Sequence, residues 1–173
     1  MISSKLSVIK SVFLIFRIIT LHAKNWIVMK ITRIFDLLNN YIEKYPDQNS
    51  ALACKRNGEW LRFSIGEYKE ITDLISLGLI HAGLKPGDNI GIVGKNRPEW
   101  NMIDMAIMQA GGISVPIYPT ISEQDYRFIL RHSEMKMIFI DGDEILKKLE
   151  PVIGEMLNLR ECFLFDMDKQ NRF

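Results

Sequence analysis

The fold class is decided by residues 87–134, GDNIGIVGKNRPEWNMIDMAIMQAGGISVPIYPTISEQDYRFILRHSE. Short apolar runs alternate here with helical periodicity, which predicts two strand–helix units in succession. Apolar strands that are each followed by a helix favour parallel pairing, right-handed crossovers and helices on both faces of the sheet. The expected elements are a strand over Asn89–Val93, a helix over Arg97–Ala110 capped by Asn96, a strand over Ile113–Tyr118 and a helix from Ser122 through His132.

Further elements are expected on both sides of this stretch. Downstream they are a strand over Met135–Ile140, a short helix over Glu144–Ile153 ended near Pro151, and a strand over Glu161–Phe165. Upstream they are a helix over 33–45 capped by Thr32, a hairpin of Ala51–Arg56 and Glu59–Phe63 around Asn57-Gly58, and a helix from a Ser64/Glu67 capping box to Gly83. The expected fold is therefore α/β, with a β-hairpin and helices followed by βαβαβ units and a parallel sheet.

Several residues between these elements admit both a structural and a functional interpretation. The turn from Gly91 to Asn96 could hold an anion, but Asn96 replaces the Ser/Thr of a Walker loop, so a tight turn is favoured. Trp100 is expected to pack into the core rather than stack on a nucleotide. Pro116 predicts a strand end or a bulge, because proline has no N–H for the ladder.

The formal net charge of +1 conceals an asymmetry along the chain. Residues 1–30 carry five basic and no acidic side chains, whereas residues 31–173 carry 17 basic and 21 acidic ones, a difference of −4. A mildly acidic body argues against nucleic-acid binding. Cys54 and Cys162 have no nearby Cys or His at metal-binding spacing, so they are expected to be buried free thiols in a reducing, cytoplasmic compartment.

Residues 1–28 form a basic, apolar extension for which three interpretations stay open. Met29 opens a natural first helix, so the extension could come from a wrongly assigned start. Lys10, Arg17 and Lys24 are seven residues apart, which suits a helix at a membrane interface and a peripheral membrane location. A cleaved signal fits worst, because charges break the apolar region.

Four segments together resemble the N-terminal portion of long-chain acyl-CoA synthetases, in the AMP-dependent synthetase/ligase, adenylate-forming superfamily. They are GDNIGIV at 87–93, NRPEW at 96–100, AGGISVPIYPT at 110–120 and YRFILRHSE at 126–134. The resemblance spans roughly Thr32 to Ile140, and its specificity lies in the order and spacing of the set. It makes residues 29–173 an incomplete AMP-dependent synthetase/ligase N-terminal domain.

The resemblance implies a two-step ligation of a fatty acid to coenzyme A. ATP and the fatty acid form an acyl-adenylate and pyrophosphate, with Mg²⁺ assisting, and the acyl group then passes to the CoA thiol. The family's phosphate loop, Thr-Glu pair, ribose-binding Asp and C-terminal lysine have no counterpart in these 173 residues. We therefore assign no catalytic, cofactor-binding or metal-binding residue here, and expect a fragment that is inactive alone.

A non-catalytic binding or regulatory module with a flavodoxin-like or receiver-like sheet is the alternative. Asp141 and Asp143 are the only acidic pair placed as a receiver would require. His132 is expected to stabilise a helix C-terminus, and His22 and His81 lack triad partners. A truncated sheet would also expose apolar surface and self-associate. The methionines, which cluster at Met102, Met105, Met108, Met135 and Met137, are expected to fill the core.

Overall fold

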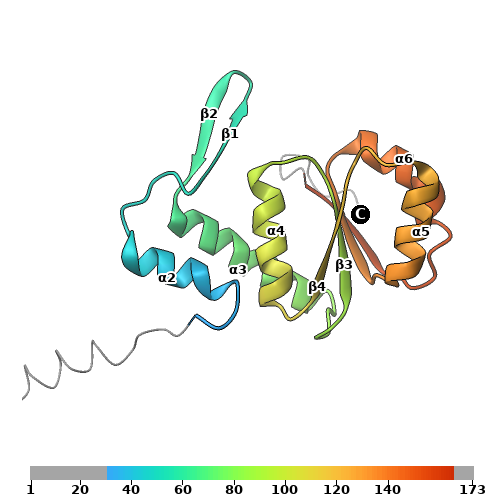
Figure 1. The fold of residues 1–173 in the computed structure, drawn as a ribbon, viewed down its shortest axis with the longest axis horizontal. Helices are drawn as coiled ribbons and strands as arrows, with labels where there is room; N and C mark the ends of the chain where they lie inside the picture. The colour runs from blue at the N-terminus through green and yellow to red at the C-terminus, as the bar shows by residue number, and fades with distance from the viewer. Residues whose placement is uncertain (1–30, 166–173) are drawn as a thin grey trace, which may run out of the picture. The chain divides into compact units, whose positions relative to one another are not determined.

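The computed structural model describes residues 31–165 of the chain (Figure 1). The chain divides into two units, residues 1–32 and 33–173, and every element below belongs to the second. The interpretations of residues 1–28 and of His22 lie outside the described residues. No helix within 31–165 is both long and apolar enough to span a membrane.

The centre of the described unit is a four-stranded, entirely parallel sheet, which confirms the predicted topology. Its order is β4-β3-β5-β6, so the chain moves from β3 to one neighbour and then crosses to the other side. The strands are β3 (Asn89–Val93), β4 (Ile113–Ile117), β5 (Met137–Ile140) and β6 (Glu161–Leu164). β5 is buried along its whole length, as a central strand covered on both faces must be.

Helices cover both faces of this sheet (Figure 1). Ile90 and Ile92 of β3 join one core cluster with α3 and α4, while Val93 joins another with α5 and α6, because successive strand residues face opposite sides. The helices are α3 (Ile65–His81), α4 (Pro98–Gln109), α5 (Glu123–Ser133) and α6 (Asp143–Ile153). Met102, Met135 and Met137 are buried, which confirms their role in the core.

The upstream part consists of α2 (Asp36–Lys44) and an antiparallel hairpin of β1 (Leu52–Arg56) and β2 (Glu59–Phe63). Asn57 and Gly58 both adopt positive φ, 53° and 87°, as a two-residue hairpin turn requires. Leu38 of α2 is buried beside α3 in a third core cluster. The predicted hairpin is thus confirmed at its turn and in both strands.

Three of the predicted helix ends are confirmed by their hydrogen bonds. Ser64 and Ser122 each form a full capping box, with Glu67 and Asp125 respectively. Gly83 has φ +87° after α3, and the bond from Leu84 N–H to Leu79 C=O (3.0 Å) closes a Schellman motif. These local signals were readable because they involve residues at most five apart.

Two predicted caps were wrong. α2 begins at Asp36 instead of 33, because the Asp36 carboxylate accepts a hydrogen bond from Arg33 N–H (3.0 Å) and closes a turn ahead of the helix; Thr32 is therefore not the cap. Arg97, not Asn96, is the N-cap of α4. Pro98 disfavours helical geometry in the residue before it, and Arg97 accordingly has extended φ and ψ of −152° and 158°.

Of the two prolines that lie within elements after α4, Pro116 differs from expectation and Pro151 does not. Pro116 lies inside β4 and not at a bulge, in register with Ile92. The strand tolerates it because β4 is an edge strand, where a missing N–H need not break the ladder. Pro151 lies in the last turn of α6, which ends at Ile153 as predicted; a proline there removes only one helical hydrogen bond.

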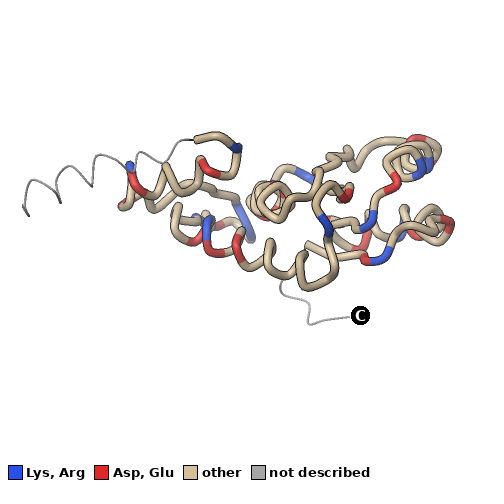
Figure 2. The backbone as a smooth tube through the Cα atoms, turned by 90° about the horizontal axis from the view of Figure 1, so that it is seen from below, with Lys and Arg blue, Asp and Glu red and all other residues tan. Residues whose placement is uncertain are grey.

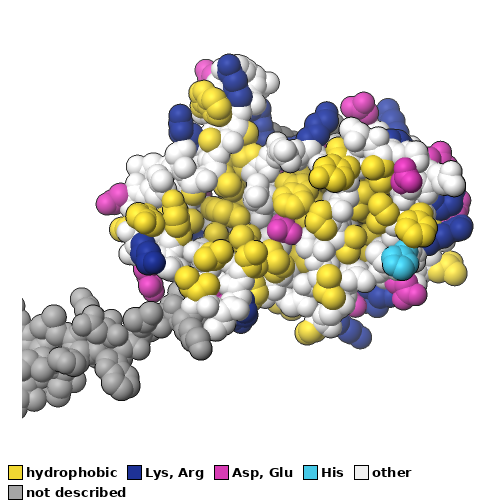
Figure 3. All heavy atoms as spheres, in the orientation of Figure 1, with side chains coloured by type: hydrophobic (Ala, Val, Ile, Leu, Met, Phe, Trp, Pro, Cys, Tyr) yellow, Lys and Arg dark blue, Asp and Glu magenta, His cyan; other side chains and the backbone are white. Residues whose placement is uncertain are grey.

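Several large apolar side chains are exposed on α2 and α3, whereas none of those on β5 and β6 is. Leu74, Leu77 and Ile80 of α3 are 53–64% exposed. The buried residues of the same helix are Ile65, Tyr68, Thr72, Ser76 and Leu79. Figure 3 shows hydrophobic side chains gathered over α2 and α3.

Candidate functional site

The candidate site lies at the carboxyl ends of β3 and β5. The chain leaves β3 through α4 and crosses to β4 on one side, and it leaves β5 through α6 and crosses to β6 on the other side. The connections that follow these two neighbouring strands therefore run in opposite directions. Such a topological switch point is where open α/β sheets generally form a ligand crevice. Lys95, Asn96 and Arg97 follow β3, and Asp141 follows β5.

Arg97 is the centre of an ion-pair network at this edge. Its Nη1 donates to Asp141 Oδ1 (2.6 Å), while its Nε and Nη2 donate to the two carboxylate oxygens of Glu99 (2.9 and 2.8 Å). The Asp141 carboxylate also accepts the Lys95 N–H at 3.0 Å. The fork-to-carboxylate geometry fixes the guanidinium in one orientation and ties the end of β3 to the end of β5.

The hairpin joins the same network through Arg56. Its Nη2 donates to Glu99 Oε1 at 2.6 Å, so one carboxylate bridges two guanidinium groups. The two residues are 43 positions apart in the chain. Glu99 therefore connects β1, α4 and, through Arg97, β5.

The charge of Glu99 is strongly favoured by this arrangement. Burial alone would raise the pKa of Glu99, but hydrogen bonds from Arg97, from its own backbone N–H and from Arg56 outweigh it and lower the pKa to about 2. The pKa of Arg97 is raised, chiefly by its hydrogen bonds to Glu99. Both groups remain ionised at neutral pH, so neither is available as a general acid or base there.

A hollow of about 640 Å³ opens beside the network. It is lined by Ala53, Cys54, Lys55 and Arg56 of the hairpin and by Lys95, Asn96, Arg97 and Asp141 of the sheet edge. Gly94 lies next to it, and a Cβ there would stand 2.9 Å from both Asp141 Cβ and the Phe165 ring. Only glycine permits this close approach of β3 to the end of β5.

A smaller pocket of about 260 Å³ lies toward β4. Trp100 lines it together with Gly94, Asn96, Pro116, Ile117 and Tyr118. Trp100 also packs against the core cluster under α3 and α4, as predicted, but it remains half-buried. Asn96 borders both pockets and is exposed, which is consistent with a turn residue.

The acidic pair of the receiver-like alternative does not form an acidic cluster. Asp141 is held by Arg97 and Lys95 N–H, while Asp143 lies in the first turn of α6. Within residues 31–165 no group of three or more His, Cys, Asp or Glu could hold a metal ion. The described residues therefore do not fit an Mg²⁺ site: Glu99 and Asp141, the carboxylates at this edge, already neutralise arginines.

The predicted thiols are only partly as expected. Cys54 and Cys162 are free, but both are half-buried rather than buried. Cys54 lies on the hairpin, one face of which meets the hollow. Burial raises the pKa of Cys162 to about 11, which keeps its thiol protonated and unreactive at neutral pH.

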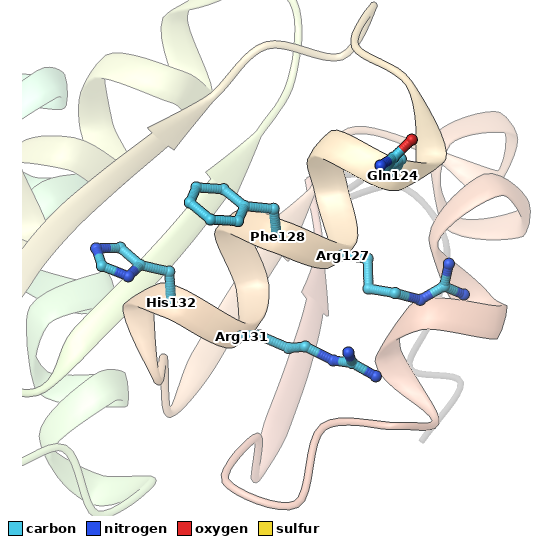
Figure 4. A pocket seen from close by; sticks show the side chains of 5 residues that line it. All are labelled: Gln124, Arg127, Phe128, Arg131 and His132. Atoms are coloured by element: carbon cyan, nitrogen blue, oxygen red, sulfur yellow. The ribbon is translucent and has the colours of Figure 1, made fainter.

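His132 lies on the exposed side of α5 (Figure 4). Its ring stacks on Phe128 with centroids 5.6 Å apart, and the two line a shallow groove with Gln124, Arg127 and Arg131. Both arginines pair with Glu155, which lies two residues beyond the end of α6, at 3.1 and 2.8 Å. His132 is in the last turn of α5, as predicted, and His81 is in the last turn of α3.

Sequence reasoning did not identify the network as a unit. Arg97 and Glu99 were interpreted only as a helix start, and Arg56 only as a hairpin residue. One signal in the sequence could have predicted the pairing of Arg97 with Asp141. Each residue follows a strand of the parallel sheet, and the carboxyl ends of parallel strands lie at the same edge. Figure 2 shows why charge patterning did not help, since Lys/Arg and Asp/Glu positions are interspersed over the described backbone.

An α/β unit with this parallel sheet and hairpin is typical of adenylate-forming ligases, and sequence comparison agrees. The model of the AMP-binding enzyme family matches residues 38–172. The chain belongs to the AMP-binding enzyme family.

Its curated relatives include long-chain-fatty-acid–CoA ligases. ACSBG2 of Xenopus laevis is 30% identical over 127 residues, which are 73% of this chain and 17% of the relative. FadD15 of Mycobacterium bovis is 32% identical over 105 residues (61% and 18%), and long chain acyl-CoA synthetase 1 of Arabidopsis thaliana is 29% identical over 126 (70% and 19%). The chain thus spans less than a fifth of the length of these relatives.

Solved structures confirm the fold. A putative long-chain-fatty-acid CoA ligase from Rhodopseudomonas palustris aligns with a TM-score of 0.69 at 17% identity, over 81% of this chain and 34% of its own. A fatty acyl-adenylate ligase from L. pneumophila, in complex with acyl adenylate and pyrophosphate, aligns with a TM-score of 0.64 at 18% identity, over 82% and 24%.

Proposed function

We propose that this chain is the N-terminal part of a long-chain fatty acid–CoA ligase, which converts ATP, a fatty acid and CoA to acyl-CoA, AMP and pyrophosphate through an acyl-adenylate. The family match over residues 38–172 carries the proposal, and the long-chain ligases among the relatives indicate the substrate class. Fatty acid and CoA are the partners, and ATP and Mg²⁺ the cofactors, of the complete enzyme.

In this proposal residues 31–165 act as a scaffold rather than as the source of catalytic groups. The ion pairs among Arg56, Arg97, Glu99 and Asp141 support this role, because they neutralise the ionisable groups that a substrate would otherwise meet. Adenylation needs donors and a cation around the transferred phosphate. Those elements would come from parts of the enzyme that this chain does not match.

An assay of the purified 173-residue chain tests the scaffold role. With palmitate, ATP, Mg²⁺ and CoA, we expect neither pyrophosphate release nor acyl-CoA above the protein-free rate. Pyrophosphate release that depends on the fatty acid would show that the chain holds catalytic groups and would refute the proposal.

A chimera tests the substrate class. Residues 38–172 would replace the matching segment of the Mycobacterium bovis FadD15 protein, and we expect a folded chimera that retains long-chain acyl-CoA formation. A control chimera carrying Arg97→Gln, which removes the central cation of the network, should lose thermal stability. A chimera with a cooperative melt but no acyl-CoA formation would count against the assignment.

One observation favours the alternative function, a non-catalytic binding or regulatory module. The order β4-β3-β5-β6 matches the first four strands of a flavodoxin-like sheet, whose switch point binds a ligand. Peripheral membrane contact rests on residues 1–28 and stays a proposal. Flotation of the chain with and without those residues on anionic liposomes tests it, with binding expected only when they are present.

A further inference from the structure

The hollow beside the switch point of the sheet has an unusual charge balance. Four basic side chains line it or border it, against the two carboxylates of Glu99 and Asp141, which leaves an excess of two positive charges. The basic residues are Lys55, Arg56, Lys95 and Arg97. The unit as a whole is mildly acidic, so this excess is local and does not follow from overall composition.

The basic groups differ in how they are held. Arg56 and Arg97 are fixed by Glu99, with the Arg97 side chain only 20% exposed. Lys55 comes from the hairpin and Lys95 from the end of β3. Both are exposed and, within the described residues, take part in no ion pair. Two exposed ammonium groups on flexible stems therefore line the same hollow as a paired set of guanidinium groups.

We propose that this hollow binds a phosphate-bearing anion, with Lys55 and Lys95 closing on it from two sides. Lysine ammonium groups bind phosphate as point charges, and a partly enclosed cationic cleft raises the local concentration of anions. A volume of about 640 Å³ accommodates a diphosphate or a small phosphate ester and exceeds what a single halide would need. This proposal does not rest on the proposed function, because it is argued from the charges and the volume of the hollow alone.

The test is titration of the full 173-residue chain with inorganic pyrophosphate at constant ionic strength, by calorimetry and by amide chemical shifts. We expect saturable binding with shift changes at 53–56 and 94–97. The double variant Lys55→Gln/Lys95→Gln should weaken binding at least tenfold. Its matched control is Lys85→Gln/Lys147→Gln, which removes the same charge at two exposed lysines outside the hollow and should leave binding unchanged.

Two further measurements distinguish a specific phosphate site from unfolding of the variants and from diffuse charge attraction. Thermal melts of all variants establish that the glutamine variants remain folded, and the shift map reports the location of binding independently of them. Equal weakening by both double variants would mean diffuse charge attraction and would overturn the proposal, as would shift changes centred elsewhere. Adenosine without phosphate should not bind; binding by adenosine would show recognition of a base and contradict a phosphate site.

Discussion

Glu99 is the residue that joins the hairpin to the ion-pair network at the sheet edge. It is 12% exposed at the side chain and accepts from both Arg56 and Arg97. Removing one partner from such a bridge leaves a buried charge only partly compensated, which costs more than that pair itself contributes. The residue would be unremarkable in an isolated helix, where an acid in the first turn is ordinary.

The lowered pKa of Glu99 predicts how stability depends on pH. Because the folded pKa of about 2 lies below the ordinary value of 4.5, the ionised group stabilises the fold above pH 4.5, and that contribution is lost as pH falls toward 2. A shift of this size corresponds to about 3 kcal/mol at most. Glu99→Gln should therefore be less stable at pH 7 and should show a flatter loss of stability between pH 4.5 and 2.

Urea unfolding at several pH values checks this expectation. Glu70→Gln serves as the control, because Glu70 is exposed on α3 and the variant removes the same charge. The control should follow the parent protein across the range. A Glu99→Gln variant that tracked the parent equally well would mean that the network does not hold the carboxylate in its ionised form.

At the scale of elements, α5 shows how local chemistry sets a boundary. Ser122 Oγ accepts from Asp125 N–H at 3.2 Å and donates to the Asp125 carboxylate at 2.6 Å. The bond donated by Asp125 satisfies a helix N–H group that has no partner in the preceding turn. Tyr126, one turn into the helix, is fully buried, so the start of α5 also determines which face meets the sheet.

The capping box of α5 can be tested by truncation of its serine. Ser122→Ala should destabilise the protein by about 1 kcal/mol, since the N-cap acceptor is lost. For a chain of this size that lowers the melting temperature by roughly 2–4 °C. Calorimetry measures the shift against Thr120→Ala, a neighbouring exposed position that should change little; similar shifts in both variants would argue against a capping role.

At the scale of the whole molecule, α3 presents large apolar side chains to solvent. Leu74, Leu77 and Ile80 recur every third residue and are more than half exposed. Figure 3 shows hydrophobic side chains on the surface over the helices of this region. Contiguous apolar surface of this kind favours association, whereas scattered single residues do not.

Self-association should therefore depend on α3. Leu74→Gln/Leu77→Gln should shift sedimentation-velocity profiles toward the monomer, because it removes apolar area without touching the buried face of the helix. Leu157→Gln is the control, since Leu157 is fully exposed in the loop before β6. A monodisperse monomer in the parent protein, or equal effects of both variants, would contradict the expectation.

Much of the fold could be predicted from the sequence because its signals are local. Asn57-Gly58 specifies a hairpin turn through positive φ, Ser64 specifies a helix start through a bond three residues away, and apolar strands followed by helices specify parallel pairing. The errors arose where two local signals competed. Pro98 moved the cap of α4 from Asn96 to Arg97, and Asp36 delayed α2.

By itself, then, the sequence determined the elements, their order and the resemblance to long-chain acyl-CoA synthetases, since these depend on neighbours within about five residues or on motif order. Only the tertiary structure decided that Arg56, Glu99 and Asp141 meet around Arg97, and that two lysines face one hollow. Arg56 and Glu99 are 43 positions apart in the chain, and Arg97 and Asp141 are 44 positions apart. Nothing in their local pattern specifies pairing; the crossovers of the parallel sheet and the docking of the hairpin bring them together.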